Sequence, residues 1–247
     1  MPPELTWAVI ASCSAIFLVA ATVTSFSGFG FALFAVPLMS LFLDLKFAVP
    51  LVLLAGFFSV IVLSINKLEF FFKEPTIIMV FIGMTAGTVV GTHILAHFET
   101  GLLKRLLGVI VALFAVHVFF HVRTQTATRH RGFIGLIAGI CSGIAGGIFG
   151  TSGPPLVVYL NHFAEDRSSF RSQILVLFLL HDVFRFFLYL RYSLITAQTF
   201  RFGLVLLPPL ALGLFAGSRM HFKVSERTFN KSIAVLLFIS GLLLLKP

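Results

Sequence analysis

Three ionisable residues, His181, Asp182 and Arg185, lie close together inside the apolar segment 172–190. An ionisable side chain inside a membrane-spanning helix is costly, so it usually faces a cavity or a partner. Helical spacing lets Asp182 reach Arg185 at i,i+3 and puts His181 on the same face at i,i+4. Two interpretations stay open. Arg185 binds an anionic substrate while His181 or Asp182 takes part in proton coupling, or Arg185 only pairs with Asp182 or extends to the membrane interface.

Two glycine-rich stretches interrupt apolar segments and present a second set of polar groups. Glycine and proline weaken helices, and inside lipid the freed backbone groups must be satisfied by protein or by a watery cavity. A break also exposes helix N-termini, whose N–H groups attract anions, and nearby hydroxyls add donors. The alternative is that the glycines only permit close helix packing. The candidate substrate-binding residues in these stretches are Ser25, Ser27, Gly28, Phe29, Gly30, Gly146, Gly147, Gly150, Thr151, Ser152 and Gly153.

The composition indicates that a lipid bilayer surrounds these residues. Of the 247 residues, 58% are hydrophobic and only 11% are charged, more apolar surface than a soluble domain of this length could bury. Apolar stretches of membrane-spanning length recur from end to end. Most of the Lys and Arg residues behind the net charge of +9 lie in short loops, which is typical of membrane proteins. We therefore expect a bilayer around the protein and no nucleic-acid partner.

The two halves of the chain resemble each other. The stretch Gly87 to His93 matches Gly213 to Arg219, and Gly28 to Pro37 spans nine positions, as does Gly146 to Pro155. Internal repeats of this kind recur in secondary transporters. The predicted units are an N-terminal membrane repeat at 1–121, a basic linker at 122–131 and a C-terminal membrane repeat at 132–247.

The distribution of positive charge favours one topology. If each broken pair of segments is one ordinary span, the loops on the two sides hold nine and eight Lys and Arg residues, which is no bias. If each pair is a hairpin that enters and leaves on the same face, the counts become eleven and six. Each half then has three full spans, an odd number, so the repeats are inverted. We predict an all-α, polytopic transmembrane protein of two inverted four-segment repeats, with the first segment of each broken or hairpin-like.

Histidines at helical spacing raise the question of a metal site. His93 and His97 are spaced i,i+4, as are His117 and His121, and this spacing could bind a metal. Each pair lacks a third ligand, and the two pairs fall at opposite ends of consecutive helices, so we expect no metal and no cofactor. His93 aligns with Arg219 of the other half and is a third candidate for proton coupling.

The glycine-rich motifs and the duplicated halves resemble those of the TauE/SafE family. The motifs that carry the resemblance are Gly28 to Leu38 and Gly147 to Leu156, and the resemblance covers essentially the whole chain. It implies a membrane permease for sulfite, organosulfonates or related anions. Phe31 stands where many members have another glycine, so this stretch is expected to be more helical than in those members.

We therefore expect a secondary transporter, working as an exporter, for a small anion held at the two helix breaks. Alternating access would come from rocking one half against the other. A passive anion channel remains an alternative, and an integral membrane enzyme is a weaker one, because the chain has only nine Asp and Glu residues and most lie in loops. The expected location is a bacterial inner (plasma) membrane, with periplasmic termini. Apolar helix faces would allow a homodimer, but lipid would cover them equally well.

Overall fold

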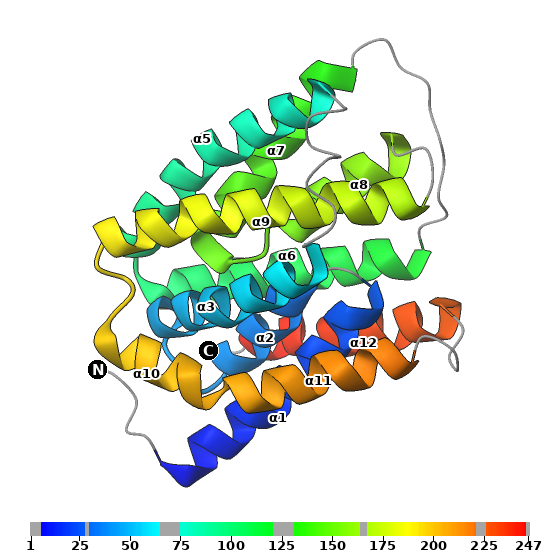
Figure 1. Cartoon of the computed structure of the whole chain (residues 1–247). Helices are drawn as coiled ribbons and strands as arrows, with labels where there is room; N and C mark the ends of the chain where they lie inside the picture. The colour runs from blue at the N-terminus through cyan, green and yellow to red at the C-terminus, as the bar shows by residue number, and fades with distance from the viewer. Residues whose placement is uncertain are drawn as a thin grey trace.

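The computed structural model describes residues 6–27, 30–64, 75–120, 131–163, 167–220 and 226–245. Within these ranges the chain forms eleven α-helices and no strand, which confirms the all-helical prediction. Many of the helices lie side by side across one bundle, and α9 crosses its middle (Figure 1). The predicted linker lies outside the described residues except for Arg131, which begins α7.

The helices before the linker are α1 (Trp7–Ser27), α2 (Phe31–Ser40), α3 (Leu45–Ser64), α5 (Pro75–His97) and α6 (Thr100–Phe120). The helices after it are α7 (Arg131–Phe149), α8 (Gly153–Phe163), α9 (Arg167–Arg191), α10 (Ala197–Val205), α11 (Leu207–Met220) and α12 (Glu226–Leu245).

Several helices have the length and composition of membrane spans. Among the described residues, α1, α5, α7 and α9 are each long and apolar enough to cross a membrane. The pair α10 and α11, bent by 45°, would make a fifth span. Pro208 and Pro209 lie in the first turn of α11, where their missing N–H groups interrupt the hydrogen-bond ladder that would join the two helices.

Glycines bring α5 and α7 into backbone contact. A Cβ on Gly83, Gly87 or Gly91 of α5 would collide with carbonyl oxygens of α7. A Cβ on Gly139 or Gly143 of α7 would in turn collide with carbonyl oxygens of α5. Small residues at a spacing of four allow such close approach. The contacts advance together along both helices, so α5 and α7 run parallel.

Two further helix pairs pack through glycine. Gly213 and Gly217 of α11 face backbone carbonyls of α1, and these contacts also advance together along both helices. Gly108 of α6 and Gly241 of α12 face each other directly, and there the two helices run antiparallel (Figure 1). In all three pairs, a helix before the linker packs against one after it.

The helices α7 and α8 form an antiparallel hairpin. The guanidinium of Arg131, at the start of α7, donates to the carbonyl of Phe163, at the end of α8, at 2.9 Å. The hydroxyl of Tyr159 donates to the carbonyl of Arg131 at 3.2 Å. The helix α2 also returns along α1, since the ring of Phe31 lies edge-on against that of Phe17 with centroids 5.2 Å apart. The chain therefore enters and leaves the α7–α8 pair at the same end of the bundle.

Three turns meet at the other end of the bundle. The ammonium of Lys46, just after the α2–α3 turn, donates to the carbonyl of Ala96, just before the α5–α6 turn, at 2.9 Å. The hydroxyl of Tyr192, after α9, lies 3.4 Å from Nδ1 of His93 near the end of α5. These contacts hold the α2–α3, α5–α6 and α9–α10 turns together, opposite Arg131 (Figure 1).

The glycine contact between α5 and α7 predicts a large stability difference between two glycine substitutions. Gly143→Ala would put a Cβ into the carbonyl of Met84, and because backbone cannot move aside easily we expect a loss of roughly 1–3 kcal/mol or more. Gly101→Ala in the first turn of α6 meets no atom within 4 Å and should be neutral or slightly stabilising. Thermal unfolding in detergent measures both variants, and equal midpoints would contradict the close packing.

Candidate functional site

Two helix N-termini and the α7–α8 break surround a cavity of about 50 Å³. Gly30 and the first turn of α2 form one side, and the link from Gly150 to Gly153 that leads into α8 forms another. The helices α1, α3 and α9 supply the remaining walls. This volume holds a few water molecules, and a small oxyanion is of comparable size. The two breaks predicted from the sequence therefore line one common cavity.

Glycine is required by the backbone at both breaks. Gly30, which precedes α2, has φ 105°, and Gly150, which follows α7, has φ 70°. This left-handed region is costly for residues that carry a Cβ. The N–H of Gly150 still donates to the carbonyl of Gly146 at 2.8 Å, so α7 closes its last turn before the chain reverses.

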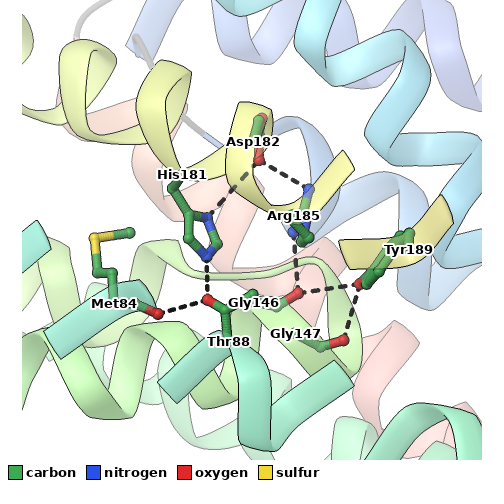
Figure 2. A network of polar contacts seen from close by, with 8 residues as sticks. All are labelled: Met84, Thr88, Gly146, Gly147, His181, Asp182, Arg185 and Tyr189. Atoms are coloured by element: carbon green, nitrogen blue, oxygen red, sulfur yellow. Dashed lines mark hydrogen bonds and ion pairs between the residues drawn. The ribbon is translucent and has the colours of Figure 1, made fainter. Parts of the chain in front are cut away.

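Arg185 reaches the cavity from α9 with its charge held in place on two sides. Its Nη2 lies 2.9 Å from Oδ1 of Asp182, and its Nη1 donates to the carbonyl of Gly146 at 3.0 Å (Figure 2). Arg185 is only 2% exposed as a residue, and its Nε has no hydrogen-bond partner among the described residues. Arg185 and Asp182 both line the cavity. A buried guanidinium with an unused donor is suited to bind an anion.

Tyr189 completes the contacts between α9 and the end of α7. Its hydroxyl lies 2.8 Å from the carbonyl of Gly147 and 3.4 Å from that of Gly146, and the guanidinium of Arg185 lies 5.7 Å from its ring centroid (Figure 2). The last carbonyl groups of a helix lack intrahelical partners, and a positive charge beside them is favourable. Arg185 and Tyr189 therefore satisfy the end of α7 inside the bundle.

His181 connects the same part of α9 to α5. The hydroxyl of Thr88 donates to the carbonyl of Met84 at 2.6 Å, and Nε2 of His181 lies 2.6 Å from the Thr88 oxygen (Figure 2). The Thr88 hydroxyl has a single hydrogen, which it donates to Met84, so it can only accept a hydrogen bond from His181. The imidazole proton is therefore assigned to Nε2. The other nitrogen, Nδ1, then has no hydrogen-bond partner and lies 3.8 Å from Oδ1 of Asp182. A second proton on His181 would therefore face that carboxylate.

Thr151 supplies a second unused polar group at the cavity. Its residue is 2% exposed, and its hydroxyl oxygen has no partner among the described residues. A buried donor without a partner costs free energy, which a bound ligand would recover. Ser152 and Gly153 follow it into the first turn of α8 and also line the cavity. Together with the start of α2, this arrangement directs two helix N-termini and one hydroxyl at the same space as Arg185.

The predicted residues divide between the cavity and the helix contacts. Gly30, Gly150, Thr151, Ser152, Gly153 and Arg185 line the cavity, as does Asp182. Gly146 and Gly147 pack instead: a Cβ on Gly146 would lie 2.6 Å from Cε1 of His181, and one on Gly147 would lie 2.7 Å from the carbonyl of Thr88.

At the first break, the side chain of α1 that lines the cavity is not the predicted one. Ser25 packs against Gly217 of α11, and its carbonyl accepts from Arg171 at 3.2 Å, whereas the preceding Thr24 lines the cavity. Thr24 was not among the predicted residues, and the available signal was its place one residue before the predicted Ser25. The side chain of Ser27, and Gly28 and Phe29 entirely, lie outside the described residues. The helix α2 begins at Phe31.

His93 does not lie at the cavity. Its exposed ring stands 4.2 Å from that of His97, centroid to centroid, and contacts Tyr192 at the end of the bundle where three turns meet. The part of the chain that the structure describes contains no cluster of three or more potential metal-ligating His, Cys, Asp or Glu side chains. The side chain of His117, and His121 itself, lie outside that part.

One of three comparisons with known proteins identifies the family of the chain. The model of the family described as sulfite exporter TauE/SafE matches residues 13–244, which is nearly the whole chain. Comparison with curated proteins and with solved structures gives no match. The family consists of membrane transporters, and several of the described helices are long and apolar enough to cross a membrane. The chain therefore belongs to the sulfite exporter TauE/SafE family and is an integral membrane transporter.

Proposed function

We propose that this transporter moves a small anion, such as sulfite or an organosulfonate, out of the cell by holding it in the cavity between the two helix breaks. The observation that carries the proposal is the buried guanidinium of Arg185, whose Nε is unpartnered, in the lining of the same cavity as Thr151, whose hydroxyl is also unpartnered. A cavity of about 50 Å³ favours an anion of the size of sulfite over a larger organosulfonate. The cell-interior-negative potential favours the outward movement of an anion.

The charges around the cavity suit one net negative charge on the ligand. Asp182 neutralises Arg185 at 2.9 Å when no anion is bound. The N-termini of α2 and α8 each add roughly half a positive charge. A bound anion competes with Asp182 for the same guanidinium, so a proton on Asp182 frees Arg185 for the anion. His181, with Nδ1 at 3.8 Å from Asp182, is the nearest group to exchange that proton.

Inverted repeats would give this transporter its two access states. Three observations support them: the α7–α8 hairpin, the antiparallel pair α6 and α12, and the matched glycine contacts of α5 with α7 and of α11 with α1. The end that holds Arg131 would then face the cytoplasm, and the termini the periplasm, of a bacterial inner membrane. A passive anion channel is the other reading of the same cavity. A carrier gives trans-stimulated exchange in proteoliposomes, whereas a channel gives uncoupled conductance.

Removing the hydroxyl of Thr151 should weaken anion binding. Thr151→Val keeps the shape of the side chain and deletes one donor, and the loss of a hydrogen bond to a charged ligand should raise the KM for sulfite flux roughly tenfold. Thr92→Val is the matched control, because Thr92 on α5 is equally buried, its hydroxyl is also unpartnered, and it lies outside the cavity lining. Equal KM values for the two variants would remove Thr151 from the site.

Removing both charges, those of Arg185 and Asp182, should restore stability without restoring transport. Arg185→Gln alone leaves the Asp182 carboxylate buried without its partner, at a cost of about 3–5 kcal/mol. The double variant Arg185→Gln with Asp182→Asn removes both charges, so we expect the thermal midpoint to recover while sulfite flux stays lost. Recovery of flux together with stability would mean that Arg185 has only a structural role.

Asp182→Asn alone should abolish the pH dependence of anion binding. In the unchanged protein, protonation of Asp182 releases Arg185, so affinity should rise as the pH falls; the amide mimics the protonated acid at every pH. Methanesulfonate is the appropriate probe because its own charge stays constant across the range. Binding measured by thermal shift should therefore be pH-dependent in the wild type and flat in Asp182→Asn, and a slope that persists in the variant would exclude Asp182 as the coupling residue.

A further inference from the structure

One face of α9 continues from the cavity toward a second arginine. Arg171, Phe178 and Arg185 are spaced by seven residues, which is close to two helical turns, so the three side chains share one face of the helix. Phe178 and Arg185 line the cavity, and Arg171 lies about 10 Å beyond Phe178 along the axis. The cavity wall that α9 provides therefore leads from one guanidinium to another.

The facing wall follows the same direction. Val52, Gly56 and Val60 of α3 line the cavity at a spacing of four, which places them on one face of that helix. The helices α3 and α9 run antiparallel in Figure 1, so the row from Val52 to Val60 runs along α9 toward the start of that helix. The lining is thus elongated along the two helices, in the direction of Arg171.

Arg171 contacts α1 one residue away from the cavity lining. Its Nη2 donates to the carbonyl of Ser25 at 3.2 Å, and the residue before Ser25, Thr24, lines the cavity. Its Nε is buried and has no hydrogen-bond partner among the described residues. Arg185 has the same two features, a bond to a carbonyl near the end of a broken helix and an unused Nε. The two arginines thus hold the two breaks in the same manner.

We propose that Arg171 is a second anion contact, at the outer end of the cavity, and that the anion passes over Phe178 between Arg171 and Arg185. The inference rests on the anion site proposed at Arg185. The ligand class is the same small oxyanion, because the unused donor is again a guanidinium N–H. Arg131 begins α7 at this end of the bundle, where its guanidinium binds the carbonyl of Phe163, so its charge adds to that of Arg171. Their field concentrates anions there.

Charge-selective labelling between the two arginines tests the proposal. In a background with Cys13→Ala and Cys141→Ala, the variant Phe178→Cys is treated in detergent with an anionic or a cationic methanethiosulfonate of similar size. The anionic reagent should react faster. Arg171→Gln, which can still donate to the Ser25 carbonyl, should lower the anionic-to-cationic rate ratio on the order of tenfold at low salt, and added salt should reduce the difference.

A matched substitution at the far end of the same helix provides the control. Arg191 is exposed at the other end of α9, so Arg191→Gln should leave the ratio unchanged. An unchanged ratio in Arg171→Gln, or an equal fall in both variants, would overturn the proposal.

Transport kinetics give a second and independent measurement. Arg171→Gln, with Phe178 intact, should raise the KM for sulfite several-fold while the maximal rate is largely kept, and Arg171→Lys should restore most of the affinity because it keeps the charge. If Arg171→Gln leaves KM unchanged while Arg185→Gln loses transport, the second contact is wrong and the site at Arg185 stands. If neither variant changes transport, the anion site itself is wrong.

Discussion

The helix α7 ends inside the bundle, so the carbonyl groups of its last turn draw on polar side chains of a neighbouring helix. Tyr189 donates to the carbonyl of Gly147, and Arg185 donates to that of Gly146, which also accepts from the N–H of Gly150. This places a positive charge inside an apolar helix, and the charge in turn needs Asp182 one turn earlier on α9. The guanidinium still has an unused donor, Nε, and Arg185 lines the cavity at the break. The proposed anion site is thus a consequence of completing an interrupted helix in an apolar surrounding.

The glycines serve both purposes that the sequence left as alternatives. Those of α5 and α7 allow the two backbones to touch, and this brings Thr88 within reach of His181. Gly146 belongs to the packing group, because a Cβ there would meet the His181 ring. Gly150 belongs to the other group, with its positive φ and its place in the cavity wall. The close packing therefore lies within the last turns of α7, and the break follows directly after the end of this helix.

Local features were predictable from the sequence, and contacts between distant residues were not. The ion pair of Asp182 with Arg185 follows from helical spacing, and the breaks follow from the Gly and Pro pattern. The choice of Thr24 over Ser25 depends on the rotation of α1 about its axis, and a helix that is apolar on all sides carries little pattern to indicate it. Thr88 and Tyr189 were missed because neither residue is unusual in an apolar helix. His93 lies away from the cavity, because alignment between the two halves indicates equivalent positions and not neighbours.

The pairing of α1 with α11 has a consequence for how the protein is made. The hydroxyl of Thr22 on α1 lies 3.2 Å from the carbonyl of Gly213 on α11, and 191 positions separate the two residues in the chain. A ribosome synthesises the N-terminal part first. The helix α1 therefore enters the membrane long before the glycine face that covers it exists. The helix α1 is thus the first part of the cavity wall to be synthesised and among the last to be covered by its packing partner. A chain that stops short of α11 would leave this face of α1 uncovered in the membrane, where quality-control proteases could recognise it.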